Sequence, residues 1–209
     1  MIDDCWKGRE DSAVMVPGIP VEVPRFRSVA KLDDAMSCCT RCELAVGRTQ
    51  VVRGAGAKRA RVLFLGEAPG AAEDRVGQPF VGAAGRLFGR LLEQNGLNRA
   101  DVYVTNTVAC RPPANRTPHT SEVKAHTPWL EQQLRLVRPE VVVTLGRVAL
   151  TWFIPGAKVT ELTGVPQRIE WHGRELTLLP LLHPAAALRA PDRLPLLEAG
   201  FAVLRKLLR

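Results

Sequence analysis

The segment RVLFLGEAPG, residues 61–70, decides the fold class of this chain. Its first half is a short apolar run typical of a buried strand, and its second half sets Glu67 between Gly66 and Gly70, beside Pro69. A strand that ends in such a loop is typical of an open α/β sheet, in which the carboxyl ends of the strands meet at one crevice. The segment therefore predicts an α/β fold with Glu67 at the functional edge of its sheet.

Two other apolar runs end beside a reactive side chain. Residues 102–105 lead into Asn106, and residues 176–182 lead into His183 and Pro184. A third run, residues 141–145, is nearly continuously apolar, as in a parallel strand buried on both faces. Since the ends of parallel strands share one edge, we expect a carboxylate, an amide and an imidazole to meet there as an active site.

The segments between these runs carry helix signals. Apolar spacing and capping residues predict helices over about 29–39, 83–95, 120–137, 147–153 and 191–209, and a hairpin joins 169–171 to 176–179. We interpret this order as a three-layer α/β/α sandwich with a mainly parallel central sheet of about four strands. Residues 1–27 show no clear period and are interpreted as a mobile extension of a domain spanning 28–209.

Composition indicates the kind of partner. The 209 residues carry a formal net charge of +8, and such a surplus of Lys and Arg favours a phosphate-bearing partner, although it also fits a generic basic surface. No apolar stretch approaches the roughly 20 residues of a membrane helix. The start of the chain shows no secretory signal, so we expect a soluble cytoplasmic protein with reduced cysteines and no membrane partner.

Four motifs in order resemble those of the family 4 uracil-DNA glycosylases. They are GEAPGAAED, GQPFVGAAGRL, VYVTNTVACRPPANR and LLHPAAALR, and the resemblance runs from about Cys39 to the end of the chain. It implies the uracil-DNA glycosylase fold and a function in base excision repair. A uracil base would be flipped out of DNA and its N-glycosidic bond hydrolysed, leaving an abasic site.

The resemblance also implies a role for each pocket residue. Phe80 would stack under the flipped uracil, and the Asn106 amide would read its edge, donating to O4 and accepting from N3–H. Glu73 would shape the pocket wall and exclude the thymine methyl group. Ala68 stands in the substrate pocket where the family 1 enzymes have an Asp, which leaves the share of catalysis carried by Glu67 open.

The chemistry implied by the resemblance is hydrolysis. His183 would donate to uracil O2, where negative charge builds as the bond breaks, and Glu67 would position or activate the attacking water. No lysine stands in the four motifs as an amine nucleophile, so we expect a monofunctional enzyme that needs no soluble organic cofactor. The alternative is a DNA-binding protein of the same fold that senses damaged bases with little or no hydrolysis.

DNA contacts are expected from the loops around the pocket. Arg111 and Arg116 lie in a loop rich in proline, and Arg189 lies close to His183, so all three are candidates to contact DNA. Leu188 resembles the wedge that enters the minor groove and fills the gap left by the flipped base, although it could equally pack in the core. We expect the protein to act as a monomer on uracil-containing DNA.

A metal centre is the last expectation from the resemblance. Family members hold a structural [4Fe-4S] cluster with four cysteines, and here Cys39, Cys42 and Cys110 occupy three of those positions. The fourth position, sixteen residues after Cys110, holds His126 instead of cysteine. Imidazole ligands occur in Rieske iron-sulfur centres, so we predict that His126 is the fourth ligand. Zinc bound by three cysteines and one histidine is the alternative that the residue types leave open.

Overall fold

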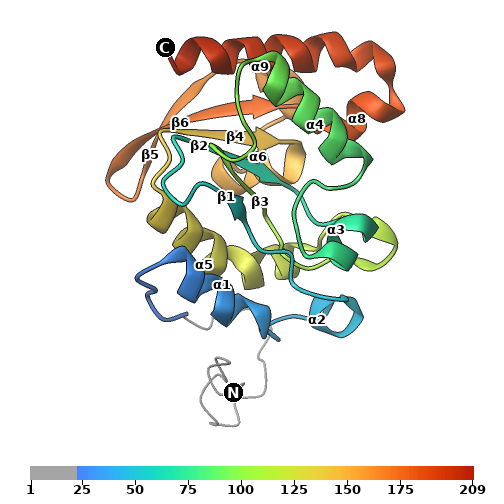
Figure 1. Ribbon diagram of the computed structural model, residues 1–209, viewed down its shortest axis with the longest axis vertical. Helices are drawn as coiled ribbons and strands as arrows, with labels where there is room; N and C mark the ends of the chain where they lie inside the picture. The colour runs from blue at the N-terminus through green and yellow to red at the C-terminus, as the bar shows by residue number, and fades with distance from the viewer. Residues whose placement is uncertain (1–22) are drawn as a thin grey trace.

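The computed structural model describes residues 23–209, so most of the extension expected at 1–27 lies outside the described residues (Figure 1). Within that part, helices cover both faces of a single sheet. The strands are β1 (Ala55–Gly56), β2 (Val62–Gly66), β3 (Tyr103–Asn106), β4 (Val141–Leu145), β5 (Gln167–Trp171) and β6 (Arg174–Leu181). The helices are α1 (Val29–Ser37), α2 (Leu44–Gly47), α3 (Ala71–Val76), α4 (Ala83–Gln94), α5 (Thr120–Val137), α6 (Arg147–Phe153), α7 (Val159–Leu162), α8 (Pro184–Arg189) and α9 (Leu194–Leu207), with 3-10 turns at Pro113–Asn115 and Pro191–Arg193.

The sheet has the strand order β1-β3-β2-β4-β6-β5. Its four central strands are parallel, whereas β1 and β5 pair antiparallel at the two edges. The predicted α/β/α sandwich with a mainly parallel sheet is therefore confirmed. The sheet is wider than the expected four strands, because the two-residue strand β1 pairs with β3 and the predicted hairpin adds β5 at the other edge.

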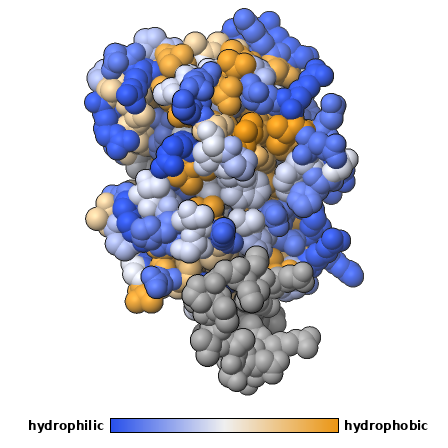
Figure 2. All heavy atoms as spheres, turned by 180° about the vertical axis from the view of Figure 1, so that it is seen from behind, coloured by the Kyte–Doolittle hydropathy of each residue, from blue (hydrophilic) through white to orange (hydrophobic). Residues whose placement is uncertain are grey.

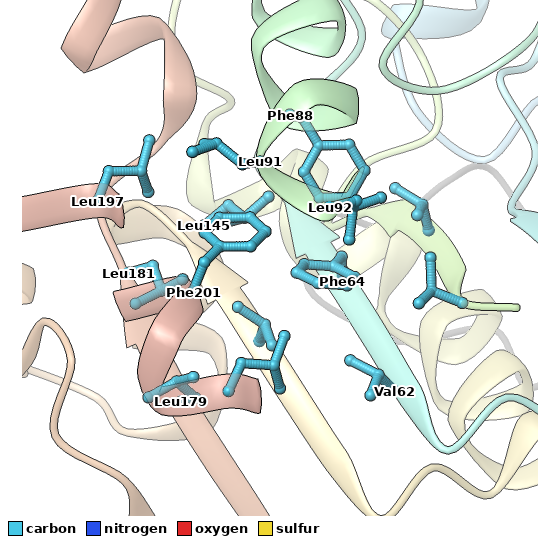
Figure 3. Close-up of a cluster of buried hydrophobic side chains, with 14 of the residues drawn as sticks. Val62, Phe64, Phe88, Leu91, Leu92, Leu145, Leu179, Leu181, Leu197 and Phe201 are labelled. Carbon is cyan, nitrogen blue, oxygen red and sulfur yellow. The ribbon is translucent and has the colours of Figure 1, made fainter. Parts of the chain in front are cut away.

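Two apolar clusters hold the layers together, one on each face of the sheet. On the face covered by α4, α8 and α9, the Phe64 ring packs edge-on against Phe88 at 4.8 Å and parallel to Phe201 at 5.8 Å between centroids (Figure 3). On the face covered by α5 and α6, the alternate residues Leu63 and Leu65 of β2 pack against the helices. Every residue of β2 is buried, as expected of a central parallel strand.

A third apolar cluster joins α1, α2 and α5 below the sheet. It contains Cys39, Cys110 and Trp129, and the Phe26 ring packs against it with its centroid 6.0 Å from that of Trp129. The Arg135 guanidinium donates to the Phe26 carbonyl at 2.6 Å. Phe26 therefore packs against the domain, although the sequence analysis placed it in the mobile extension of residues 1–27.

The surface is mainly polar. The face seen in Figure 2 is largely hydrophilic and carries separate hydrophobic patches. Among the described residues no helix combines the length and the apolar character needed to cross a lipid bilayer.

Candidate active site

The carboxyl ends of the parallel strands bring the predicted pocket residues together. β2 ends at Gly66, which pairs in register with Asn106 at the end of β3, and Glu67 follows directly. His183 stands two residues beyond the end of β6. A Cβ atom at Gly66 would collide with Asn106 Oδ1 and with the Phe80 ring, so both side chains lie against this glycine. An amide, an aromatic ring and the Glu67 loop therefore surround one point.

Phe80 is held in a strained backbone conformation beside that point. Its φ of 57° lies in the left-handed region, which bulky residues rarely adopt. Helix α4 packs so closely that a Cβ at Gly85 would overlap the Phe80 carbonyl group. The Phe80 ring centroid lies 5.1 Å from that of Phe88 and 5.6 Å from that of His183. Such strain persists where the surrounding structure enforces it, and it is concentrated at functional sites.

His183 is fixed in one neutral tautomer. It is the N-cap residue of α8, and its Nδ1 atom accepts a hydrogen bond from the Ala185 amide at 3.1 Å. Since a backbone N–H only donates, Nδ1 carries no proton, and the ring proton of neutral histidine is on Nε2. Burial, and then the positive charge of Arg189, lower the pKa of His183 to about 4, against a smaller opposing effect of Glu73. The imidazole is therefore a neutral Nε2–H donor at physiological pH.

Glu73 ties the two loops that border the pocket. One carboxylate oxygen accepts from the backbone amides of Val81 and Gly82 at 2.9 and 2.7 Å, and the other accepts from Gly70 at 3.2 Å. Gly70 begins α3 and Gly82 begins α4, so a single carboxylate links the starts of both helices. These contacts fix the loop around Phe80 relative to the Glu67 loop.

Arg99 restrains the same loop from another element. Its Nη2 group donates to the Pro79 carbonyl at 2.8 Å, and its guanidinium lies over the Phe88 ring, 5.2 Å from the centroid. Burial lowers the pKa of Arg99 to about 10, which keeps it charged at neutral pH. Its buried Nη1 atom has no hydrogen-bond partner among the described residues. Sequence reasoning missed Arg99, because no local pattern connects it to a residue 20 positions earlier.

The polar side chains at the strand ends remain available to a ligand. Asn106 is buried at 5% exposure, yet its amide makes no hydrogen bond to another residue within 23–209. Glu67 is half-buried, and its backbone carbonyl accepts from the Val108 amide at 3.2 Å. Ala68 is half-buried too and packs against the third apolar cluster. The loop backbone is thus fixed while the Glu67 carboxylate stays accessible.

The residues expected to contact DNA differ in their exposure and in their intramolecular partners. Leu188 is 46% exposed at the end of α8, with Arg189 exposed beside it. Arg111 is half-buried and donates to the Asn115 side chain at 2.8 Å. Arg116 instead forms a two-pronged ion pair with buried Glu122, with nitrogen–oxygen distances of 2.6 and 2.8 Å. The Arg116 guanidinium therefore has an intramolecular partner.

A shallow hollow beside Leu188 adds two basic residues that the sequence analysis did not name. It has a volume of about 570 Å³ and lies between α4 and α8, where Arg86 and Arg90 are exposed. Their spacing of one helical turn, on the side of α4 away from its buried leucines, was the signal that could have found them. The exposed leucine and the two arginines line this hollow together with Glu93.

The predicted metal ligands gather where α1, α2 and α5 meet. Cys39 Sγ accepts from the Trp129 indole at 3.3 Å, Cys110 Sγ accepts from Arg48 at 3.3 Å, and Cys42 Sγ lies 3.9 Å from His126 Nδ1. The three thiols are near enough to influence one another electrostatically, and burial raises the pKa of Cys110 to about 11.

The donor set contains ligand types that an iron-sulfur cluster or a zinc ion can use. Within residues 23–209, no three His, Cys, Asp or Glu side chains are close enough to hold a single metal ion. In a [4Fe-4S] cluster each ligand binds a different iron, so its ligands are farther apart than those around zinc. His126 Nδ1 lies 2.9 Å from the Glu122 carbonyl, which only accepts, so Nδ1 carries the proton, and the same atom is the one beside Cys42 Sγ. Arg41 and Arg48 supply nearby positive charge.

Comparisons with known proteins identify the family of this chain. Residues 53–207 match the model of the uracil DNA glycosylase superfamily. A type-4 uracil-DNA glycosylase of Thermotoga maritima is 45% identical over 153 residues, covering 72% of this chain and 78% of that protein. The type-4 enzyme of Sulfurisphaera tokodaii is 37% identical over 186 residues, covering 86% and 84%. A type-5 enzyme of Thermus thermophilus is 40% identical over 115 residues, but these cover only 47% of this chain.

Proposed function

The chain belongs to the uracil DNA glycosylase superfamily, and we propose that it is a monofunctional type-4 uracil-DNA glycosylase of base excision repair. It flips uracil out of DNA and hydrolyses the bond between uracil N1 and the sugar C1′, leaving an abasic site. The observation that carries this proposal is the convergence of Asn106 and Phe80 at Gly66, with the His183 ring beside Phe80.

Asn106 and Phe80 recognise the flipped base. Uracil presents an acceptor at O4 and a donor at N3–H, and the Asn106 amide matches both with its NH₂ group and its Oδ1 atom. Cytosine presents the reverse pattern and would leave the buried amide unpaired, which costs about 1–3 kcal/mol for each unmade bond. The half-buried Phe80 ring supports the base by stacking.

His183 stabilises the leaving group. When the C1′–N1 bond breaks, its electron pair stays with the uracil ring, and negative charge builds on O2. The Nε2–H of neutral His183 donates to that oxygen, and the hydrogen bond strengthens as the charge develops. Because the ring is already neutral and oriented by Ala185, the donor needs no rearrangement during the reaction.

Glu67 completes the hydrolysis. Its accessible carboxylate faces positive charge on the sugar and holds the water whose oxygen bonds to C1′, taking one proton from that water. Glu73 positions the loops through its three backbone contacts, which we favour over direct exclusion of the thymine methyl group. None of the four motifs offers a lysine for an imine intermediate, so the strand is left uncut.

DNA binds across the surface around the pocket. Leu188 fills the gap left by the flipped base, while Arg189, Arg86 and Arg90 contact phosphates on either side. Arg111 contributes from the neighbouring loop. We propose that the active form is a monomer. Its DNA substrate puts it at the nucleoid, in the cytoplasm.

Cys39, Cys42, Cys110 and His126 hold a structural [4Fe-4S] cluster in this proposal. The cluster would fix α1 and α2 against α5 and the loop that carries Arg111, and it takes no part in hydrolysis. The gathering of the three thiols beside His126 supports this proposal, and zinc bound by the same four side chains is the alternative that metal analysis would reveal.

The test of the proposal is uracil excision itself. Purified protein is incubated with matched single- and double-stranded oligonucleotides carrying U or T at one position, and abasic sites are cut with alkali. We expect cutting at U and none at T, without an added cofactor. A folded protein that binds the uracil strand and yields no abasic site would contradict the proposal and identify a binding protein instead.

A further inference from the structure

An arginine-lined groove lies at the end of the sheet opposite the pocket. It has a volume of about 930 Å³ and is bordered by α5 and by the β5–β6 turn at His172 and Gly173. β6 runs from this turn toward His183, and its eight residues span roughly 26 Å at about 3.3 Å each. The groove is therefore a separate surface from the proposed uracil pocket.

Four guanidinium groups line this groove, from Arg25, Arg135, Arg138 and Arg174. None of them forms an ion pair within residues 23–209, and Glu131 is the carboxylate that shares the lining. The pKa of Arg174 is lowered first by burial and then by the positive charge of Arg138, which shows that the two guanidinium groups are close enough to repel each other. Unpaired like charges in a hollow favour an anion, which would relieve their repulsion.

The groove also offers a flat apolar surface beside these charges. Trp171 is half-buried and lines it, and the exposed His172 ring packs edge-on against the indole at 4.4 Å between centroids. Arginine forks bind phosphates bidentately, and an indole face stacks on any base. The combination of a basic track with an aromatic platform is typical of sites for single-stranded nucleic acid, whereas an acidic peptide would need no platform.

We propose that this groove binds a single-stranded segment of DNA, with Arg138 and Arg174 on its phosphates and Trp171 beneath a base. The site would hold a strand outside the uracil pocket and increase the affinity for long substrates. The choice of DNA as the ligand rests on the proposed function, but the binding itself is measured without uracil.

The test compares an Arg138→Gln/Arg174→Gln variant with the intact protein. Binding of a fluorescent uracil-free oligothymidine is measured by anisotropy over a series of salt concentrations. Loss of two phosphate contacts should reduce the slope of log K against log salt by about 1.4, at roughly 0.7 per contact on a single strand. Arg138→Lys/Arg174→Lys keeps the charges and should retain most of the slope. Arg205→Gln/Lys206→Gln removes the same charge from exposed positions on α9 and should leave the slope near that of the intact protein.

The outcomes separate the groove from the pocket. Uracil excision from a five-nucleotide substrate, too short to reach the groove, should be the same in all variants. A salt slope unchanged in the Arg138→Gln/Arg174→Gln variant would overturn the proposal. So would a competition experiment in which polyglutamate displaces the fluorescent oligothymidine and unlabelled oligothymidine does not. If the intact protein binds oligothymidine through the groove but excises no uracil, the proposed function fails while this site stands.

Discussion

Replacing His183 with asparagine separates its role as the N-cap of α8 from its role as the Nε2–H donor to uracil O2. Asparagine is a good N-cap residue, so His183→Asn should keep the hydrogen bond from the Ala185 amide while losing the Nε2–H donor. Loss of one preorganised donor to a developing oxyanion typically lowers the rate by 10²–10³. We expect single-turnover uracil excision to fall by roughly that factor. His183→Ala loses the cap as well, which should cost about 1 kcal/mol of additional stability.

The same substitution should change how stability depends on pH. The pKa of His183 falls from 6.5 to about 4 on folding, so the folded protein favours the neutral ring. Its contribution is fully present above pH 6.5 and is lost as the pH falls toward 4, because only the unfolded chain then takes up the proton. At 1.36 kcal/mol per pKa unit the loss is about 3 kcal/mol. His183→Asn should remove this part of the acid destabilisation.

The measurements are single-turnover excision, binding to an oligonucleotide with a non-cleavable uridine analogue, and urea unfolding at pH 7.5 and 4.5. The asparagine variant should bind nearly as well as the intact protein and lose less stability between the two pH values. All other titratable groups are the same in both proteins, so the comparison isolates His183. Equal losses of binding and of chemistry would refute the oxyanion role, and an unchanged pH dependence would refute the buried neutral ring.

Four further outcomes are expected. Asn106→Asp should weaken uracil excision at neutral pH, because an ionised carboxylate cannot donate to O4; unchanged rates on U would remove this residue from the pocket. Arg99→Met should raise KM for uracil DNA by roughly 10-fold through misplacement of Phe80, with partial rescue in Arg99→Lys, and equal melting temperatures with equal KM would exclude this positioning role. His126→Cys should retain iron and the brown absorbance in aerobically purified protein while His126→Ala loses them, and stoichiometric zinc without iron would contradict the cluster. Phe26→Ala should lower the unfolding free energy by about 3 kcal/mol without changing excision by folded protein, and an unchanged denaturation midpoint would show that its packing is unimportant.

The strand-end geometry was predictable because it follows from parallel pairing. β2 and β4 are apolar runs interrupted by a single polar residue, Thr144, and parallel strands align their carboxyl ends. The edge where Glu67 and Asn106 meet could therefore be predicted from the sequence. Helices α3 and α8 were missed. Each has six residues with too few turns to show an apolar period, and each begins inside a segment that reads as a Gly- or Pro-rich loop.

Contacts between distant loops left no pattern in the sequence. The predicted role of Glu73 was a pocket wall, but its carboxylate is occupied by backbone amides up to nine residues away. Arg116 was expected to contact DNA, yet the buried Glu122 carboxylate six residues later pairs with it. Such partners depend on how loops fold back, and residue type alone does not reveal them.

The strained backbone of Phe80 and the orientation of the His183 ring are both maintained by segments that adjoin the strands of the sheet. A left-handed Phe80 costs of order 1–3 kcal/mol, which exceeds what one hydrogen bond returns, so several independent contacts must hold it. Glu73 supplies two on one side of the residue and Arg99 a third on the other, from elements anchored to β2 and β3. His183 is oriented by α8, which follows β6 directly. Because β2, β3 and the last four residues of β6 are buried, the stacking ring and the oxyanion donor keep their separation without substrate, and binding energy need not be used to assemble them.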